Sequence, residues 1–286
     1  MLDVPIVDAH VHLWNPRQLR IPWLDGDDLL DKPYGLPEYR EHTHDVDVEA
    51  MVFIEVDVAP SYRLLEAQKA ILQAQEDPRL KGIVASAPLE DGECAREFLA
   101  TLRTLSPLVK GVRRLLQEES DPNFALRHDF VRGVQLLPEY GFSFDICIFH
   151  HQLASIIELV RRCPDTAFML DHIAKPAIKD ALLDPWREQM QTLASFPNVM
   201  CKISGMVTEA DHQHWTEEDL APYLNHVLDV FGEDRVAFGS DWPVVLHASS
   251  YKRWVEALDA LTAHLSTEVR RKLWADNARR FYWLEA

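Results

Sequence analysis

The sequence predicts an α/β protein that folds as a single (β/α)8 barrel over residues 1–286. Short apolar segments of strand length alternate with amphipathic segments of helical spacing. There are eight such alternations, at intervals of about 25 to 45 residues. The strand segments are apolar on both faces, as in a buried parallel sheet. The count and the chain length fit one barrel, and no shift in composition marks a linker.

The first strand is expected within residues 6–14, which read Ile-Val-Asp-Ala-His-Val-His-Leu-Trp. These residues alternate with the period of a strand, so His10 and His12 should share one face. The long segment 15–47 follows, with four prolines and no sustained period, and is expected to be irregular. Loops of this length inside a domain are usually functional.

The remaining elements follow in a regular rhythm. Seven more strands are expected at residues 51–56, 82–87, 109–115, 143–148, 167–171, 199–203 and 235–239. Helices are expected near residues 61–75, 94–105, 129–137, 152–162, 186–194, 221–231, 250–263 and 267–281. A doubly wound open sheet is the alternative, but no glycine-rich phosphate turn follows the first strand.

Composition limits the function classes. The net charge of -17 argues against nucleic acid and against an anionic membrane surface as partners. The chain shows no basic-then-apolar leader and no apolar run long enough to span a bilayer. The four cysteines form no Cys-x-x-Cys pair and are expected to be reduced core residues. We therefore expect a cytoplasmic protein that acts on a small molecule.

Ionisable residues gather at the ends of the predicted strands. In (β/α)8 barrels the carboxyl ends of the strands, here called the rim, carry the active site. Helix surfaces would receive such residues equally often by chance, so their concentration at the rim favours an active site. The rim residues are His10, His12, Arg113, Arg114, His150, His151, His172, Lys202, Ser204 and Asp241.

Asp241 is the strongest catalytic candidate because it directly follows a buried apolar strand, where a carboxylate can take a proton from water. Its structural alternatives are capping the next helix and pairing with Arg113. His10, His12 and His172 should stand around it, where they can polarise a carbonyl oxygen or hold a metal. The alternative for each histidine is a hydrogen-bonded core residue.

Aromatic residues lie in or beside the long loop and after the last strand. Trp14, Trp23 and Trp242 offer apolar faces to a ring-shaped ligand, although they can equally pin the loop to the barrel. The set expected to bind substrate is His10, His12, Trp14, Trp23, His150, His151, Lys202 and Trp242.

Several motifs in this order resemble the amidohydrolase superfamily. They are Asp8-Ala9-His10-Val11-His12, Asp171-His172 and Gly239-Ser240-Asp241-Trp242-Pro243. Smaller features resemble its lactonase branch, which contains L-fuconolactonases, L-rhamnonolactonases and pyrone-dicarboxylate lactonases. They are Trp14, Pro22-Trp23-Leu24, Gly111-Val112-Arg113-Arg114, Asp171-His172-Ile173-Ala174-Lys175-Pro176 and Lys202-Ile203-Ser204-Gly205. The resemblance spans nearly the whole chain.

This resemblance implies a hydrolase of carbohydrate catabolism that opens a sugar lactone of the L-fucono or L-rhamnono type. It implies that Asp241 activates water, and we expect Arg113 and His172 to stabilise the oxyanion. Two alternatives remain open: a metal-dependent decarboxylase of the same superfamily, and a non-catalytic barrel that binds a sugar acid. The sequence leaves open whether the chain forms a homo-oligomer.

The predicted metal content follows from one difference between this sequence and the two-metal members of the superfamily. Superfamily members with two metals often carry a bridging carboxylated lysine at the end of strand four, where this chain has Gly111-Val112-Arg113; Lys110 comes earlier in the strand. We therefore expect no required cofactor and at most one dispensable divalent ion. Zinc would suit His10, His12, His172 and Asp241.

Overall fold

Eight parallel strands form one sheet in the order β1 to β8, in a computed structural model that describes residues 4–285. Each strand pairs in parallel with the next one along the chain. The strands are β1 Ile6–Val11, β2 Val48–Ile54, β3 Leu80–Ser86, β4 Val109–Arg113, β5 Ser143–Ile146, β6 Phe168–Leu170, β7 Val199–Ile203 and β8 Val236–Phe238.

The sheet closes between its first and last strands. A parallel bridge joins Val11 to Trp242. The backbone N–H of His12 donates to the carbonyl of Trp242 at 2.8 Å, and that of Asp241 donates to the carbonyl of His10 at 2.9 Å. The predicted (β/α)8 barrel is therefore confirmed, and the alternative of a doubly wound open sheet is wrong. Closure also brings the first motif of the chain beside the last.

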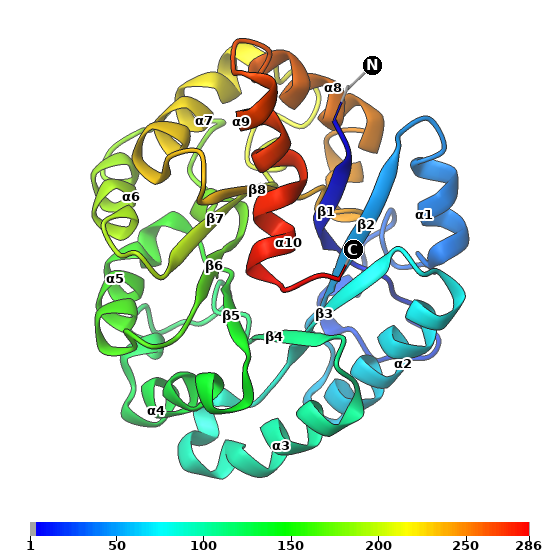
Figure 1. Cartoon of the computed structure of the whole chain (residues 1–286), viewed down its shortest axis with the longest axis vertical. Coiled ribbons are helices and arrows are strands. Elements are labelled where there is room, and N and C mark those ends of the chain that lie inside the picture. The colour runs from blue at the N-terminus through cyan, green and yellow to red at the C-terminus, as the bar shows by residue number, and fades with distance from the viewer. Residues whose placement is uncertain (1–3, 286) are drawn as a thin grey trace.

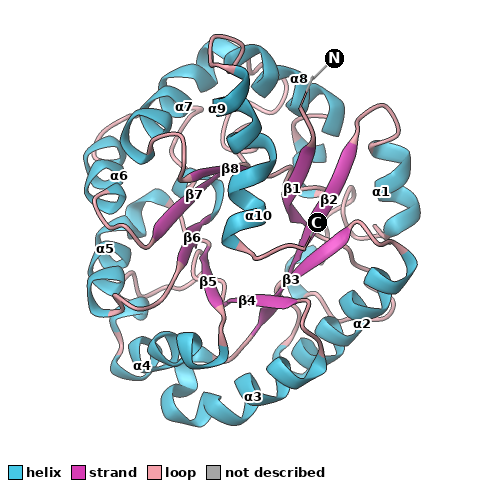
Figure 2. Cartoon of the chain, viewed as in Figure 1, coloured by secondary structure: helices cyan, strands magenta, loops and turns pink. Residues whose placement is uncertain are grey.

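The helices surround this barrel, as Figures 1 and 2 show. They are α1 Leu36–His42, α2 Arg63–Glu76, α3 Arg96–Leu105, α4 His128–Leu136, α5 Leu153–Arg162, α6 Trp186–Ala194, α7 Glu217–Phe231, α8 Tyr251–Leu261, α9 Thr267–Arg271 and α10 Asn277–Phe281. Their apolar faces pack on the outer faces of the strands in one large core. Inward-facing residues such as Val7, Val52 and Met169 form a second, smaller core.

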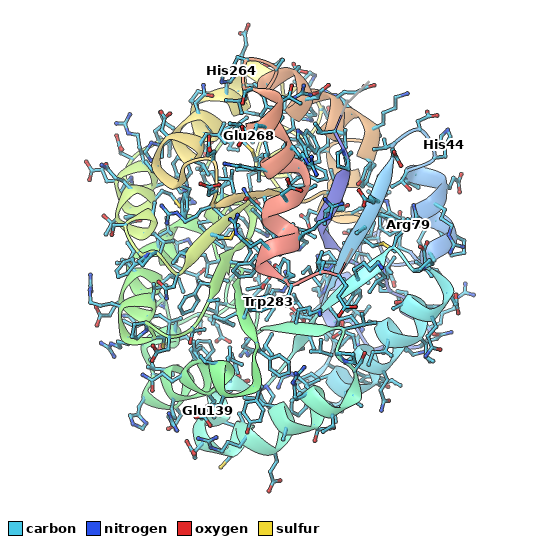
Figure 3. The ribbon with its side chains drawn as sticks, in the orientation of Figure 1. His44, Arg79, Glu139, His264, Glu268 and Trp283 are labelled. Carbon is cyan, nitrogen blue, oxygen red and sulfur yellow. The ribbon has the colours of Figure 1, made fainter. Side chains whose placement is uncertain are left out.

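The last helices cover one end of the barrel. In Figure 1 the red segment α9–α10 crosses in front of the strands. Tyr282 and Leu284 join the inner core, and the Tyr282 hydroxyl donates to Asp145 inside the barrel at 2.5 Å. Trp283, labelled in Figure 3, is 56% exposed, and its carbonyl accepts from Lys110 at 3.3 Å. Because these contacts reach the beginnings of the strands, the carboxyl ends lie at the opposite end.

Three sequence expectations need correction. The segment 15–47 contains helix α1 and a short turn at Pro22–Leu24, so it is not wholly irregular. The expected helix 267–281 is interrupted by a π-helical turn, Lys272–Asp276. Cys94 is exposed and only the other three cysteines are buried. Over residues 4–285, no helix combines the length and the apolar character needed to cross a membrane.

Candidate active site

A pocket of about 430 Å³ opens where the strands end, a size within the usual range of small-molecule sites. Its lining comes from the segments that follow β1, β2, β4, β5, β6 and β8, together with part of the long loop. The lining residues are His12, Trp23, Val56, Asp57, Arg113, Leu115, Gln117, Glu118, Cys147, His172, Lys175, Asp241 and Val244. Three of the four predicted metal ligands are therefore on the pocket wall, and His10 lies directly behind it.

The two histidines of the first strand do lie together, but the aspartate before them does not join them. The pairing of β1 with β2 shifts register between Asp8 and Val11. Asp8 accepts hydrogen bonds from the hydroxyls of Tyr39 in α1 and Tyr251 in α8, at 3.2 and 3.0 Å, on the helical side of the sheet. The backbone N–H groups of Ser240 and His10 also donate to Asp8. Asp8 therefore secures the junction of the first and last strands.

His10, His12 and Asp241 converge on one point. The Nε2 atoms of the two histidines are 3.1 Å apart, and they lie 3.6 and 3.4 Å from Asp241 Oδ1. His12 Nδ1 lies 2.8 Å from the carbonyl oxygen of Ile54. A carbonyl only accepts, so Nδ1 carries a hydrogen and Nε2 is the ring atom that faces Asp241.

This donor set fits one divalent ion. Ligand atoms at about 2.0–2.1 Å from a tetrahedral zinc stand about 3.4 Å from one another, close to the separations among His10, His12 and Asp241. His172 Nε2 lies 3.9 Å from Asp241 Oδ1, at the edge of this group.

A second group, His10 with Asp171 and His172, could also hold a metal by geometry alone. However, Asp171 Oδ1 already pairs with the ammonium of Lys202 at 2.9 Å, and Asp171 Oδ2 accepts from Arg113 at 3.2 Å. Two side-chain cations therefore occupy the surroundings of this second position.

His172 enters the pocket from a left-handed turn. The four residues from His172 to Lys175 have φ of 55°, 49°, 62° and 46°, a conformation that costs roughly 1–2 kcal/mol for each residue with a side chain. Surrounding contacts hold this turn: Trp186 Nε1 donates to the carbonyl of Ile173 at 2.8 Å. Gly205 packs so tightly on His172 that a Cβ there would lie 2.7 Å from Nδ1.

A fully buried ion cluster lies beneath the histidines. Lys202 Nζ contacts Asp145 at 2.6 Å and His10 Nδ1 at 3.3 Å, in addition to Asp171. Arg113 donates from Nε to Glu55 Oε1 at 2.6 Å and from Nη2 to the Glu55 carbonyl at 2.6 Å. Because Lys202 is 0% exposed and absent from the pocket wall, it acts on the site through His10 and Asp171.

The electrostatic surroundings lower the pKa values of His10, His172 and Asp241, so the two histidines and the aspartate have different charges near pH 7. Burial lowers the pKa of His10 and of His172 well below the usual value, so both are neutral near pH 7. Burial alone would raise the pKa of Asp241, but His172, His12 and Lys175 outweigh it and the net shift is downward. Asp241 is therefore an ionised carboxylate near the neutral rings of His10 and His172.

The predicted aromatic residues separate into two groups. Trp23 lines the pocket, is 41% exposed, and donates from Nε1 to the carbonyl of Val56 at 2.7 Å. Trp14 and Trp242 are buried behind it, where they pack edge-on against Tyr34. They are absent from the pocket wall and support the loop that carries Trp23.

His150 and His151 are also absent from the pocket wall. His150 Nδ1 lies 2.9 Å from the carbonyl oxygen of Lys175 and so supports the left-handed turn. His151 is exposed and stacks on Phe149.

Sequence reasoning assigned no site role to several residues, although Asp171 and Lys175 belong to a motif that resembles the lactonase branch. Glu55, Asp145 and Asp171 neutralise its buried cations, and Asp57 and Lys175 line the pocket. The first three carried a usable signal, since an acid next to or within a buried apolar strand must have a partner. Lys175 and Asp57 lie in loops, and their positions depend on positive φ values that no local pattern predicts.

A barrel of eight parallel strands whose rim joins a His-x-His pair, a third histidine and an aspartate defines an amidohydrolase-like protein. The family model described as amidohydrolase matches residues 7–284. The chain therefore belongs to the amidohydrolase family of enzymes.

Individual relatives are similar over their whole length. An L-fucono-1,5-lactonase of Burkholderia multivorans is 31% identical over 299 residues, covering 97% of this chain and 96% of the relative. An L-rhamnono-gamma-lactonase of Scheffersomyces stipitis is 23% identical over 338 residues, covering 99% of each. A crystal structure of an amidohydrolase from Burkholderia multivorans with bound zinc has a TM-score of 0.90 at 30% identity, covering 99% of this chain and 100% of that one.

Proposed function

We propose that this protein hydrolyses a sugar lactone, of the L-fucono or L-rhamnono type, to the corresponding aldonic acid. The observation that carries the proposal is the ionised Asp241 carboxylate on the wall of the pocket, beside His12 and the neutral ring of His172. The relatives named as lactonases support a small, uncharged ring ester as the substrate.

The reaction begins with water between Asp241 and the lactone carbonyl carbon. Asp241 takes a proton as the water oxygen forms its bond to carbon, and the carbonyl electrons move onto oxygen. The ring C–O bond then breaks, and Asp241 returns the proton to the departing alkoxide. The carboxylic acid formed in this step releases its own proton to water and becomes the carboxylate. Ser204 Oγ lies 2.9 Å from His172 Nδ1; when this hydroxyl donates, the ring hydrogen is on Nε2. In that form His172 stabilises the developing oxyanion, and Arg113 adds positive charge from behind it.

The remaining residues hold and orient the lactone. Trp23 offers an exposed aromatic face to the C–H side of a sugar ring. His12 contacts the lactone from the pocket wall, and His10 fixes His12 and Asp241 from behind. A divalent ion, held by His10, His12 and Asp241 with His172 at the edge, would supply Lewis-acid polarisation of a bound oxygen. We infer at most one such ion, dispensable to activity, because the end of β4 has Gly111-Val112-Arg113 where a bridging lysine would stand, and because His172 can stabilise the oxyanion.

The test is a hydrolysis screen that follows acid release with a pH indicator. The panel contains L-fucono-1,5-lactone, L-rhamnono-γ-lactone and other aldonolactones, with Asp241→Asn as the matched control. We expect turnover of at least one sugar lactone by the wild-type chain, well above the rate of the variant. Equal rates for both proteins across the panel would refute the proposal.

A further inference from the structure

One cation on the pocket wall, Lys175, is held by a neutral group. Lys175 Nζ donates to the amide oxygen of Gln117 at 2.7 Å, and no carboxylate within residues 4–285 pairs with it. Arg113 differs, because it is bound by two buried carboxylates, those of Glu55 and Asp171. The positive charge of Arg113 is therefore largely compensated. Among the described residues, Lys175 has no carboxylate in direct contact and acts on Glu209 and Asp241 only through their electrostatic field, so its ammonium can bind a ligand.

The left-handed turn determines where this cation lies. A helical turn of either hand places residues three apart on the same side, so His172 and Lys175 both line the pocket. Ile173 and Ala174, between them, are fully buried. The carbonyl of Lys175 lies 2.9 Å from His150 Nδ1, and its N–H donates to the His172 carbonyl at 2.8 Å. The base of the Lys175 side chain is therefore fixed on the same side as the catalytic histidine.

The charge of Lys175 reaches the reacting groups. It lowers the pKa of Asp241, although less than burial raises it and less than His172 and His12 lower it. Gln117, which also lines the pocket, holds the ammonium by a neutral amide that a stronger acceptor can displace.

We propose that Lys175 is a catalytic residue whose ammonium binds the carbonyl oxygen of the lactone as it becomes an oxyanion, and then the carboxylate of the product. The inference rests on the proposed lactonase function. The substrate is neutral and both later species are anions, so an ammonium that has no carboxylate partner within residues 4–285 stabilises the anions more than the ground state and raises kcat. No proton leaves Lys175, because Asp241 carries the proton from water to the alkoxide.

The experiment compares Lys175→Met with Lys175→Arg and with Lys179→Met. Lys179 is a matched control because it lies four residues later, with its side chain 66% exposed and paired with Asp211. We expect Lys175→Met to lower kcat by about 10²–10³-fold, as the loss of one oxyanion donor does, with KM little changed. Lys175→Arg should restore part of kcat, and Lys179→Met should behave as the wild type.

A binding measurement adds a readout independent of turnover. L-fuconate, which carries the product carboxylate, should bind Lys175→Met at least about tenfold more weakly than the wild type, a loss of about 1.4 kcal/mol. Neutral L-fucose should bind both proteins alike. If Lys175→Met does not fold, Gln117→Leu provides the second test, since it removes the amide that aims the ammonium and should lower kcat in the same direction.

Failure of this inference is distinct from failure of the proposed function. A wild-type chain that hydrolyses no sugar lactone would refute the function. A wild-type chain that hydrolyses them while Lys175→Met keeps its kcat and its affinity for L-fuconate would refute the role of Lys175 alone. Equal weakening of L-fuconate and L-fucose would assign Lys175 a structural role and would also overturn the inference.

Discussion

Arg113 Nε donates to a carboxylate oxygen of Glu55 at 2.6 Å, and both side chains are buried. Removing one partner of such a pair leaves the other charge buried and uncompensated. We therefore expect Arg113→Met to lower the free energy of unfolding by about 3–5 kcal/mol, measured by urea denaturation. The neighbouring Arg114 pairs with Glu90 and Glu119 outside the pocket lining, so Arg114→Met serves as control. If both variants lowered the free energy of unfolding equally, the buried pair of Arg113 and Glu55 would contribute no more to stability than the more exposed pairs of Arg114.

That pair also illustrates what sequence reasoning could and could not reach. Apolar periodicity located all eight strands, and the position of the strand ends predicted that His10, His12, His172 and Asp241 would meet. Glu55 stands at the end of an equally clear apolar segment, but its partner is 58 residues away on another strand. Only barrel closure brings such charges together, so a local pattern could indicate that Glu55 needs a partner without naming it.

The prediction that the loop between β1 and β2 is wholly irregular was wrong for a different reason. Helix α1 is short, begins at Leu36-Pro37 and has no repeating apolar period of its own. The Glu38 side chain accepts from the N–H of Gly35 at 2.8 Å, which is a capping contact. The pairing of Gly35 with Glu38 was the available signal for a helix start. The prolines around it favoured an irregular interpretation.

Asp241→Asn tests the general base. An amide cannot accept the proton from water, so we expect kcat to fall by at least about 10²-fold, the usual worth of general base catalysis. Circular dichroism and the unfolding midpoint should stay close to those of the wild type, because asparagine keeps the shape of the side chain. Turnover at the wild-type rate in the variant would exclude Asp241 as the base.

Metal removal tests the role of the His10, His12 and Asp241 group. We expect at most one divalent ion per chain by elemental analysis, because β4 ends without a bridging lysine. Activity should largely survive chelation, because His172 can stabilise the oxyanion without a metal. His12→Asn should abolish the remaining zinc binding without unfolding the barrel. Complete loss of activity on chelation, with recovery on adding zinc or manganese, would overturn this prediction and favour the decarboxylase alternative.

Asp57 gives a pH-dependent stability. Burial, then repulsion by Glu55, raises its pKa to about 6, against the attraction of Arg113, Arg114 and Arg63. The unfolded value is about 3.9, so the folded state binds more protons between these values. The stability gained from protonation is complete below about pH 4 and is lost as pH rises through about 6.

Asparagine at position 57 does not titrate. The unfolding midpoint of Asp57→Asn, relative to the wild type at the same pH, should therefore rise between about pH 4 and pH 7 and then level off. Asp180→Asn, a change at an exposed aspartate, provides the control and should show no such rise. A difference between Asp57→Asn and the wild type that stays constant across this range would show that Asp57 has an ordinary pKa.

The last prediction concerns substrate choice: a neutral sugar lactone should be preferred to a dicarboxylated pyrone. Two carboxylates call for several arginine forks, because bidentate pairing holds planar anions. Of the two adjacent arginines only Arg113 lines the pocket, and it is already bound to Glu55 and Asp171. Lys175 is one cation without a carboxylate in direct contact in the part of the chain that the structure describes, which suffices for the single charge that develops on a lactone. Asp57 and Glu118 on the same wall would repel a dianion.

The net charge of -17 would also slow the capture of a dianion. We therefore expect kcat/KM for L-fucono-1,5-lactone or L-rhamnono-γ-lactone to exceed that for 2-pyrone-4,6-dicarboxylate, measured side by side at the same ionic strength. Raising the salt concentration should reduce the difference in kcat/KM between the lactones and the pyrone, because salt screens the repulsion between the acidic protein and the dianion. A tenfold preference for the pyrone, about 1.4 kcal/mol of transition-state discrimination in the opposite direction, would show that the pocket recognises anions.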